Sequence, residues 1–463
     1  MSRQTSASRP DSEQGSAWYV LLASLVAATS GLLFGFDIAV INGAILFLRE
    51  QFQLSEVQTE LAASSLLAGC ILGASIGGWF SDRFGRRRIL MVSAVLFALS
   101  SAGAALPRNL SEFMAARFAG GVAIGMASLL APLYIAEIAP ARNRGRLVSM
   151  NQMAIVTGIL LAYFINWSLS YLGPGAWRWM FATAVIPSAV FLTALFFVPE
   201  SPRWLAEMGR EREALAVLSR VNGRAAALNL LEEILAAIRE ESGSLAELFQ
   251  PGLRRATALA VALAILQQIT GINTVLFYGS VIFKEQVGGQ TDTAAIGYNV
   301  AVGLVNFLAT IVALAVIDRL GRRPLLMISA SVMAACQAAL GAAFLLQPPP
   351  ALLVLAIMLV CVAAFAVGLG PGTWVLLAEI FPTRVRGRAM SIATVALWSA
   401  CFALTMTFLT LVRWLTASGA FWLYGAMCVL EFLIIWRWLP ETRGKTLEQI
   451  ERFWKQPASA VRI

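Results

Sequence analysis

The sequence predicts an all-α membrane protein whose twelve transmembrane helices form two six-helix repeats. The first observation is composition, because hydrophobic residues make up 59% of the 463 positions and charged residues only 13%, whereas roughly a quarter of the residues in soluble domains are charged. The second is that the apolar residues fall into runs of about 20, the length of helix that crosses a bilayer core. The third is that short charged motifs recur once in each half of the chain.

The apolar runs set the order of the elements. In the first half, spans are predicted near 18–41, 57–79, 89–106, 111–135, 147–170 and 178–198. In the second half, they are predicted near 256–283, 295–317, 324–346, 351–376, 389–415 and 418–439. The domains expected from this pattern are a disordered tail (1–17), a six-helix bundle (18–198), a linker (199–255), a second six-helix bundle (256–439) and a tail (440–463).

Basic residues cluster in every second loop. The clusters comprise Arg83, Arg86, Arg87, Arg88, Arg142, Arg144, Arg146, Arg319, Arg322, Arg323, Arg384, Arg386 and Arg388. Cytoplasmic loops of membrane proteins carry such an excess of Lys and Arg, so we expect these loops and both termini to be cytoplasmic. The net charge of +9 therefore reflects membrane topology, and no nucleic-acid partner is expected.

Three motifs occur twice in the same order. The segment Asp82 to Arg87 recurs 236 residues later, Glu137 to Pro140 recurs 242 residues later, and Pro199 to Ser201 recurs 241 residues later. Two halves of the same orientation are the arrangement of many alternating-access carriers. Between the halves, about 207–241 has a helix-forming composition with paired charges, and we expect short amphipathic helices there on the cytoplasmic face.

The residues that most enzymes and metal centres require are missing. The chain has no histidine, which removes most zinc sites and every His-based catalytic triad. The cysteines fall within the spans and match neither a disulfide framework nor a paired metal site; they are Cys70, Cys336, Cys361, Cys401 and Cys428. We therefore expect neither an enzyme nor a metal or cofactor.

Three amide side chains lie close together in the seventh predicted span. Gln267, Gln268 and Asn273 fall within two helical turns of an otherwise apolar run. Amides both donate and accept hydrogen bonds, which suits a neutral, polyhydroxylated solute, and each would cost about 1–3 kcal/mol if buried without a partner. Amides also cross-link membrane helices, but a cluster of three favours a binding site.

Two opposite charges fall inside the predicted spans of the first half. Asp37 lies in the first span and Arg117 in the fourth, and a charge at mid-membrane costs about 2.5–3.5 kcal/mol even on the lenient insertion scale. We therefore expect them to pair. In a chain without histidine, a proton carrier near neutral pH must be a carboxyl group in a special environment. The hypothesis is that protonation of Asp37 breaks the pair, and the alternative is a static pair between two helices.

Four motifs together resemble the sugar porter family of the major facilitator superfamily, in particular its proton-coupled bacterial members. They are Gly78 to Arg87 (Gly-x-x-x-Asp-Arg-x-Gly-Arg-Arg), Pro199 to Leu205, Gln267 to Asn273 and Pro440 to Gly444. The resemblance covers about residues 18–455. It implies the major facilitator fold and import of a monosaccharide, either a pentose or a hexose, by proton symport with alternating access.

The resemblance also implies roles for individual residues. It places Gln152, Gln267, Gln268, Asn273, Asn306 and Trp374 on the sugar, with Trp374 packing against the sugar ring. It makes Asp37 the proton-coupling residue and Arg117 its partner, where passive relatives tend to carry Asn in place of the Asp. The chain departs from the family pattern at Leu397, where Asn or Gln is usual, and at Phe277, where Tyr is usual. These departures leave the identity of the sugar open.

Matched charges near the predicted cytoplasmic ends form a candidate gate. It comprises Asp82, Arg86, Glu137, Arg144 and Glu200 in the first repeat, and Asp318, Arg322, Glu379, Arg386 and Glu441 in the second. In relatives such residues form salt bridges that hold the cytoplasmic side shut, whereas the plainer interpretation is that the charges only fix topology. Glu431, in the last span, is expected to be an interfacial acid near the cytoplasmic end.

Three other functions compete with symport. A passive uniporter is disfavoured by Asp37, and a proton-coupled exporter is disfavoured by the amides of the seventh span. A non-transporting sugar sensor usually needs a long cytoplasmic tail, and few residues follow Leu439. We expect a monomer in a bacterial plasma membrane, with a sugar, a proton and the lipid bilayer as its partners.

Overall fold

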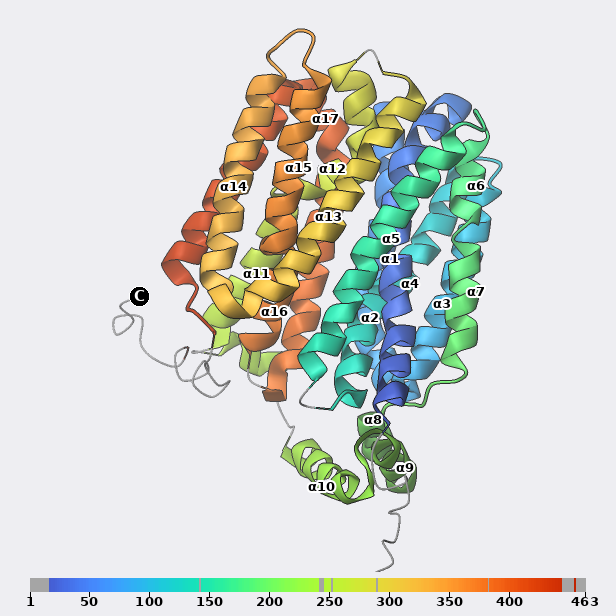
Figure 1. The fold of residues 1–463 in the computed structure, drawn as a ribbon, viewed down its shortest axis with the longest axis vertical. Helices are drawn as coiled ribbons and strands as arrows, with labels where there is room; N and C mark the ends of the chain where they lie inside the picture. The colour runs from blue at the N-terminus through green and yellow to red at the C-terminus, as the bar shows by residue number, and fades with distance from the viewer. Residues whose placement is uncertain are drawn as a thin grey trace, which may run out of the picture.

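The fold consists of two helical halves side by side and a small group of helices at one end (Figure 1). The computed structural model describes residues 16–140, 143–240, 245–250, 253–288, 290–381, 383–443 and 454. The predicted tails lie mostly outside these residues, and the side chain of Asp318 lies outside them too. Among the described residues, eleven helices are long and apolar enough to cross a membrane.

The first half contains the first six spans. Its helices are α1 (Ala17–Phe52), α2 (Glu56–Phe84), α3 (Arg86–Ala105), α4 (Leu110–Ile138), α5 (Arg144–Ser170), α6 (Ala176–Ala182) and α7 (Val185–Leu195). The last two form one interrupted span, because Pro187 has no N–H to donate to the carbonyl of Thr183. Side chains fix several starts: Ser55 and Gln58 form a capping box on α2, and Asn109 caps α4.

The second half repeats this pattern with more interruptions. Its helices are α11 (Leu253–Ile269), α12 (Ile272–Val281), the π-helix η3 (Ile282–Val287), α13 (Asp292–Leu320), α14 (Arg322–Ala343), α15 (Ala351–Val367), α16 (Leu369–Glu379) and α17 (Thr383–Trp438). The seventh span breaks at Gly271, whose φ is 87°. The long α17 contains both last predicted spans, which a kink at Thr416 separates, so the predicted spans are all present.

One predicted helix end is wrong. α1 ends at Phe52 rather than near residue 41. Asn42, a polar residue that would be costly inside a membrane helix without a partner, lies directly after the predicted end. In the structure Asn42 is buried, and its amide donates to the carbonyl oxygens of Val275 and Leu276 in the other half. Tertiary partners therefore let the helix continue through a polar position.

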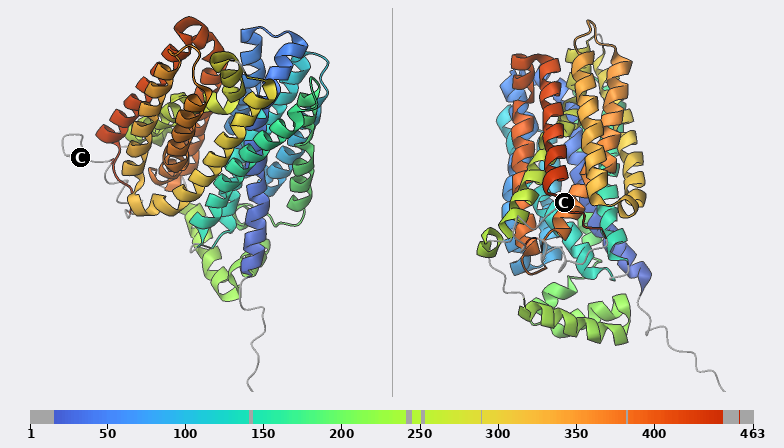
Figure 2. Two further views of the ribbon diagram at one scale, coloured as in Figure 1. Left: turned by 45° about the horizontal axis from the view of Figure 1, so that its top comes forward. Right: turned by 90° about the vertical axis from the view of Figure 1, so that its left-hand side faces the viewer.

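The linker forms the small group at one end of the bundle. It contains α8 (Pro202–Glu207), α9 (Glu211–Asn222) and α10 (Arg224–Glu240), and the short 3₁₀-helix η2 (Leu245–Phe249) that follows them contacts α11 and α17. Trp204, Leu218 and Leu231 are among the side chains that make its own apolar core, and both views in Figure 2 show α8–α10 beyond the ends of the long helices. We call this the linker end and the opposite end the far end.

Glycines allow α2 and α4 to pack closely. Gly69 and Gly73 on α2 face Gly121 and Gly125 on α4, and a Cβ atom added at any of them would collide with backbone atoms of the other helix. Both pairs follow the Gly-x-x-x-Gly spacing that lets membrane helices approach each other. These contacts make the first half a tight bundle around α4, the helix that carries Arg117.

Candidate binding site between the two halves

Asp37 and Arg117 form a buried ion pair inside the first half, as predicted from their placement in the membrane. The guanidinium of Arg117 is 0% exposed and donates through Nη1 to Oδ1 of Asp37, a residue that is 5% exposed. Nη2 donates to the backbone carbonyl of Asp37 at 3.0 Å. The guanidinium carbon also lies 5.2 Å from the ring centre of Phe181. These contacts fix α4 against α1.

The pair is not fully satisfied. Among the described residues, Oδ2 of Asp37 and Nε of Arg117 have no hydrogen-bond partner. Gly120 lies beside this oxygen, because a Cβ atom added there would be 3.1 Å from Oδ2. A carboxylate oxygen without a donor is the atom at which a proton can be added without displacing an existing contact. The role of the pair in proton coupling stays a prediction.

The three amides of the seventh span form a continuous chain of hydrogen bonds. Asn273 donates to the carbonyl oxygen of the Gln268 side chain, and Gln268 donates to that of Gln267 at 2.9 Å. Gln267 then donates to the backbone carbonyl oxygens of Leu369 at 2.9 Å and Gly370 at 3.3 Å. The chain crosses the break between α11 and α12 and reaches the start of α16. Some of the hydrogen bonds of these amides therefore link helices, and helix linkage was the alternative to sugar binding.

The other predicted sugar residues lie on three different helices. Gln152 on α5 and Trp374 on α16 are half-buried, and Asn306 on α13 is buried. The described hydrogen bonds do not connect these three side chains to the amide chain. Their assignment to the sugar stays a prediction. The assignment of Gln152 has a physical basis, since no described protein group forms a hydrogen bond with its side-chain amide.

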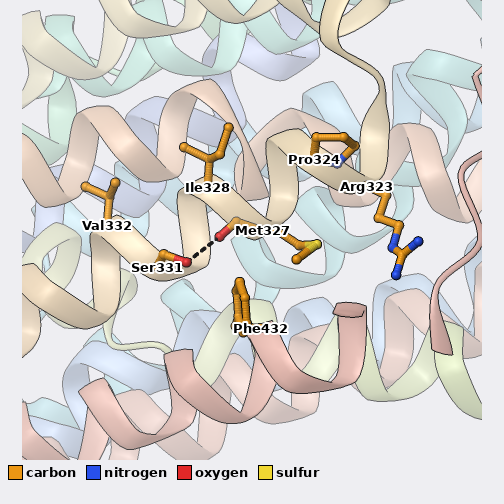
Figure 3. Close-up of a pocket in the computed structure, with 7 residues that line it drawn as sticks. All are labelled: Arg323, Pro324, Met327, Ile328, Ser331, Val332 and Phe432. Atoms are coloured by element: carbon orange, nitrogen blue, oxygen red, sulfur yellow. Dashed lines mark hydrogen bonds between the residues drawn. The ribbon is translucent and has the colours of Figure 1, made fainter. Parts of the chain in front are cut away.

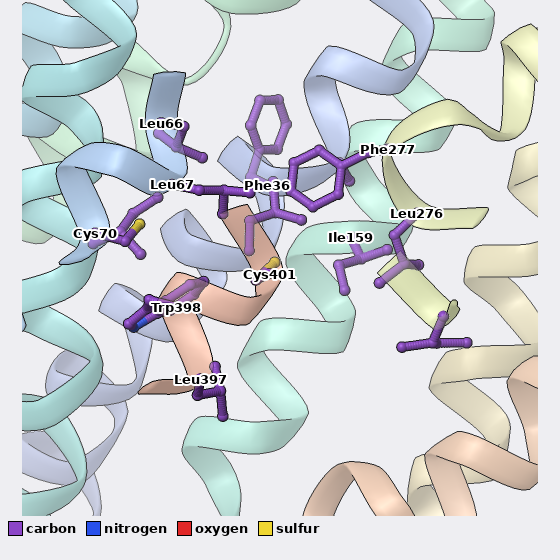
Figure 4. Close-up of a cluster of buried hydrophobic side chains, with 14 of the residues drawn as sticks. Phe36, Leu66, Leu67, Cys70, Ile159, Leu276, Phe277, Leu397, Trp398 and Cys401 are labelled. Carbon is purple, nitrogen blue, oxygen red and sulfur yellow. The ribbon is translucent and has the colours of Figure 1, made fainter. Parts of the chain in front are cut away.

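The two departures from the family pattern lie in one apolar cluster (Figure 4). Leu397 and Phe277 are both buried, and Phe36 and Ile159 of the first half belong to the same cluster. Phe34 and Trp398 also meet across the two halves, edge to face, with ring centres 5.5 Å apart. At this level the halves contact each other through apolar side chains.

Sequence reasoning missed a polar contact between the halves beside this cluster. In addition to its bonds to α12, the side chain of Asn42 accepts from the backbone N–H of Ser280 at 3.1 Å. Tyr163 of α5 donates to the carbonyl of Leu276 at 3.0 Å. The available signal was a polar residue followed by another apolar run from Gly43 to Leu48, which fits a longer helix with a buried Asn.

Ion pairs close the far end. Arg49 of α1 pairs with Glu285 of η3, and Lys284 lies 3.6 Å from Glu50 of α1 and also pairs with Asp292. The first two contacts connect the two halves. Every hydrogen bond that the structure describes between the long helices of one half and those of the other lies toward this end. The described conformation is therefore shut at the far end.

Charges at the linker end form one cluster in each half. In the first, Arg86 contacts Glu137 at 3.2 Å, Asp82 at 3.1 Å and Glu207 at 3.7 Å. Glu200 accepts from the backbone N–H of Arg87 at 3.0 Å, which fixes the turn between α2 and α3. In each of these contacts both residues precede α11, so none of them bridges the two long-helix halves.

The second cluster repeats the first. Arg322 contacts Glu379 at 2.9 Å, and Glu441 accepts from the backbone N–H groups of Arg322 and Arg323, both at 3.1 Å. Arg386 donates to the backbone carbonyl of Phe381 at 3.4 Å, whereas Arg144 in the first half is exposed. The predicted gate residues whose side chains are described are thus gathered at one end, in two sets that the described ion pairs do not join, and their role as a gate stays a prediction.

Glu431 is not the interfacial acid that we predicted. It is 0% exposed, and neither carboxylate oxygen has a hydrogen-bond partner among the described residues. Cys428, Glu431 and Ile435 are all fully buried, and their spacing of three and four residues places them on one face of α17. The position of Glu431 near the end of α17 suggested exposure, but its burial is determined by the face of the helix on which it lies.

A shallow groove of about 520 Å³ lies apart from these residues, between α14 and α17 (Figure 3). Its lining residues are Arg323, Pro324, Met327, Ile328, Ser331, Val332 and Phe432. Arg323 donates to the backbone carbonyl of Trp436 at 2.6 Å. None of the residues predicted to bind sugar or to carry the proton lines this groove, so it adds nothing to the candidate site.

Comparison with known proteins supports the same interpretation of the chain. The family model for sugar (and other) transporters matches residues 23–454. The arabinose-proton symporter of Bacillus subtilis (strain 168) is 39% identical over 452 residues, covering 96% of this chain and 97% of that protein. The D-xylose-proton symporter of Escherichia coli (strain K12) is 40% identical over 478 residues, covering 94% and 96%.

A solved structure extends the likeness to three dimensions. The proton:xylose symporter of the major facilitator superfamily, bound to 6-bromo-6-deoxy-D-glucose, superposes with a TM-score of 0.82 and is 39% identical. The match covers 95% of this chain and 99% of the other. The all-helical fold predicted from the sequence is thereby confirmed.

Proposed function

Because this chain belongs to the sugar transporter family, we propose that it imports a monosaccharide, either a pentose or a hexose, by proton symport with alternating access. The observation that carries the proposal is the buried Asp37–Arg117 pair, since a buried acid in a protein without histidine is the group available to carry a proton. The functions of both relatives, arabinose and xylose symport with a proton, favour this over a uniporter or a sensor.

The geometry suggests how a proton and a sugar are coupled. Addition of a proton to Asp37 removes the charge that holds Arg117, which weakens the contact between α1 and α4. Asn42 lies on the same helix, five residues further along, and is bonded to α12 of the other half. A change at Asp37 is therefore transmitted through α1 to the contact between the halves. A ligand shifts such an equilibrium by its different affinity for the two states.

The same proposal includes the setting of the protein. The linker end with its arginines faces the cytoplasm of a bacterial cell, both termini lie on that side, and the far end faces outward. The protein works as a monomer in the plasma membrane. The proton gradient is the only energy source, with no further cofactor.

Uptake into proteoliposomes tests the proposal. Labelled xylose, glucose and myo-inositol are offered to the purified protein with and without an inward proton gradient. Accumulation of at least one sugar above equilibrium, only with the gradient, is the expected result. Uptake that is indifferent to the gradient would instead indicate a uniporter. If folded protein transports none of the three, the sugar assignment is wrong.

Replacement of Gln152 by Ala is expected to raise the KM for the sugar about fivefold or more, because loss of one hydrogen bond from this half-buried amide costs on the order of 1–3 kcal/mol. The thermal stability should hardly change, since no described group bonds to this amide. Asn151 is a matched control, because it is the adjacent residue but packs against Gly31 of α1 within the first half. Asn151→Ala should leave the KM unchanged, and an equal rise in both variants would contradict the assignment.

A further inference from the structure

A row of polar contacts joins α2 of the first half to α17 of the second. The three contacts are Glu56 Oε2 with Arg413 Nη1 at 3.6 Å, Glu60 with Thr410, and Ser64 Oγ with Met406 Sδ at 3.3 Å. On α2 the three residues are four apart and therefore share one face. Their partners run in the opposite order along α17. We call this antiparallel row the α2–α17 seam.

Glu60 is the centre of the seam. Its Oε1 accepts from the backbone N–H of Thr410 and its Oε2 from the hydroxyl of Thr410, both at 2.8 Å. Glu60 is 1% exposed, whereas the side chains of Glu56 and Arg413 are 43% and 72% exposed. Burial of a carboxylate is costly unless hydrogen bonds satisfy it. Both of its oxygens find partners only on the opposite half.

The corresponding interface between α5 and α13 is built differently. There Gly297 packs against Trp167, and Gly303 packs against Tyr163 and Leu160, so closely that an added Cβ atom would lie 2.9–3.1 Å from the nearest atoms. Apolar surface that separates must be hydrated at a cost proportional to its area. Polar groups that separate exchange their protein partners for water, which returns part of the cost of parting. The seam is therefore the interface that can part and re-form.

We propose that the α2–α17 seam is the latch of the outer gate, and that Glu60 sets how often the binding site opens to the outside. In the described conformation the seam is formed and the far end is shut. Opening to the outside requires Glu60 to release Thr410 and become hydrated. This inference rests on the proposed transport cycle, but its test does not require that any sugar be transported.

A cysteine reporter measures the opening directly. Leu46 is buried at the far end of α1, beside Arg49 and Lys284, so a Leu46→Cys side chain reacts with an impermeant maleimide only when the far end opens. The reagent is added outside intact cells. The five native cysteines are all buried, and the chain with Leu46 intact supplies the background rate.

Glu60→Ala in the Leu46→Cys chain should raise the reaction rate about tenfold or more, because hydrogen bonds to a charged group stabilise by that factor or more. Glu60→Gln should raise it less, since the amide can accept from the N–H of Thr410 and donate to its hydroxyl. Glu56→Ala is the matched control from the same face, and an exposed ion pair of this kind contributes little. Its rate should stay within about fivefold of the parent.

Two results would overturn the latch. One is a maleimide reaction rate for Glu60→Ala that equals the rate of the parent Leu46→Cys chain, in protein that melts normally. The other is a Glu56→Ala rate raised as much as the Glu60→Ala rate, which would indicate a general loosening of the far end. If Glu60→Ala does not fold, Thr410→Val removes only the hydroxyl, and an unchanged rate in that variant contradicts the proposal. Accelerated labelling without any sugar uptake would support the latch while contradicting the proposed transport of sugar.

Discussion

Replacement of Asp37 by Asn is expected to abolish accumulation of sugar by the proton gradient, while exchange of labelled for unlabelled sugar continues. The amide keeps a hydrogen-bond acceptor for Arg117 but cannot take up a proton. The measurements are uptake and counterflow in proteoliposomes. Accumulation at the wild-type level would show that the Asp37–Arg117 contact is a static helix link, since an amide cannot carry the coupling proton.

Stability must be separated from coupling in this experiment. Loss of one partner of a buried pair leaves an uncompensated charge and typically costs about 3–5 kcal/mol. The double variant Asp37→Asn with Arg117→Gln should therefore melt at a higher temperature than the single variant but still fail to accumulate sugar. Glu431→Gln is the matched control, because Glu431 is a buried membrane-span acid whose two oxygens have no partner among the described residues. We expect its accumulation to equal that of the wild type.

Substitution of Gly121 by Ala is expected to destabilise the first half by about 3 kcal/mol, at the upper end of the usual cost of overpacking. An added Cβ atom would overlap the carbonyl oxygen of Leu66, a backbone atom that cannot rotate away. The higher helix propensity of Ala offsets only about 1 kcal/mol of this cost. The melting temperature of the detergent-solubilised protein measures the change.

Gly78→Ala is the control for this substitution. Gly78 lies on α2, the helix that packs against Gly121, but its added Cβ atom would meet only a side-chain atom of Leu129 at 3.8 Å. That is ordinary van der Waals contact, so Ala should be neutral or slightly stabilising there through its helix propensity. Equal melting temperatures for the two variants would mean that α2 and α4 are less tightly packed than the structure describes.

Local signals in the chain were sufficient to predict most of the fold. Each span has its own apolar run, and the arginine clusters at its ends are local too, so neither depends on distant contacts. The pairing of Asp37 with Arg117 was also predictable, because a bilayer leaves each charge few alternatives. The motif repeats predicted the two matched charge clusters around Arg86 and Arg322.

Side-chain contacts that depend on distant partners could not be predicted from the local sequence. The first span was predicted to end near residue 41, although the helix continues through Asn42, which contacts α12. Glu431 was placed at the interface, although it is buried inside its half. Glu60 lies near the start of the second predicted span, and nothing in the neighbouring sequence indicates its contact with Thr410. In each case the neighbour that decides the environment is on another helix, far away in the sequence.

The sequence by itself therefore determined the spans, the two repeats, the family and the positions of the charged pair and the amide cluster, because these follow from local hydropathy and spacing. Only the tertiary structure decided which groups meet across the halves: Asn42 with α12, Glu60 with Thr410, and Phe34 with Trp398. The physical reason is that burial and hydrogen bonding of a side chain are set by the helix packed against it, and helix packing is a property of the whole fold.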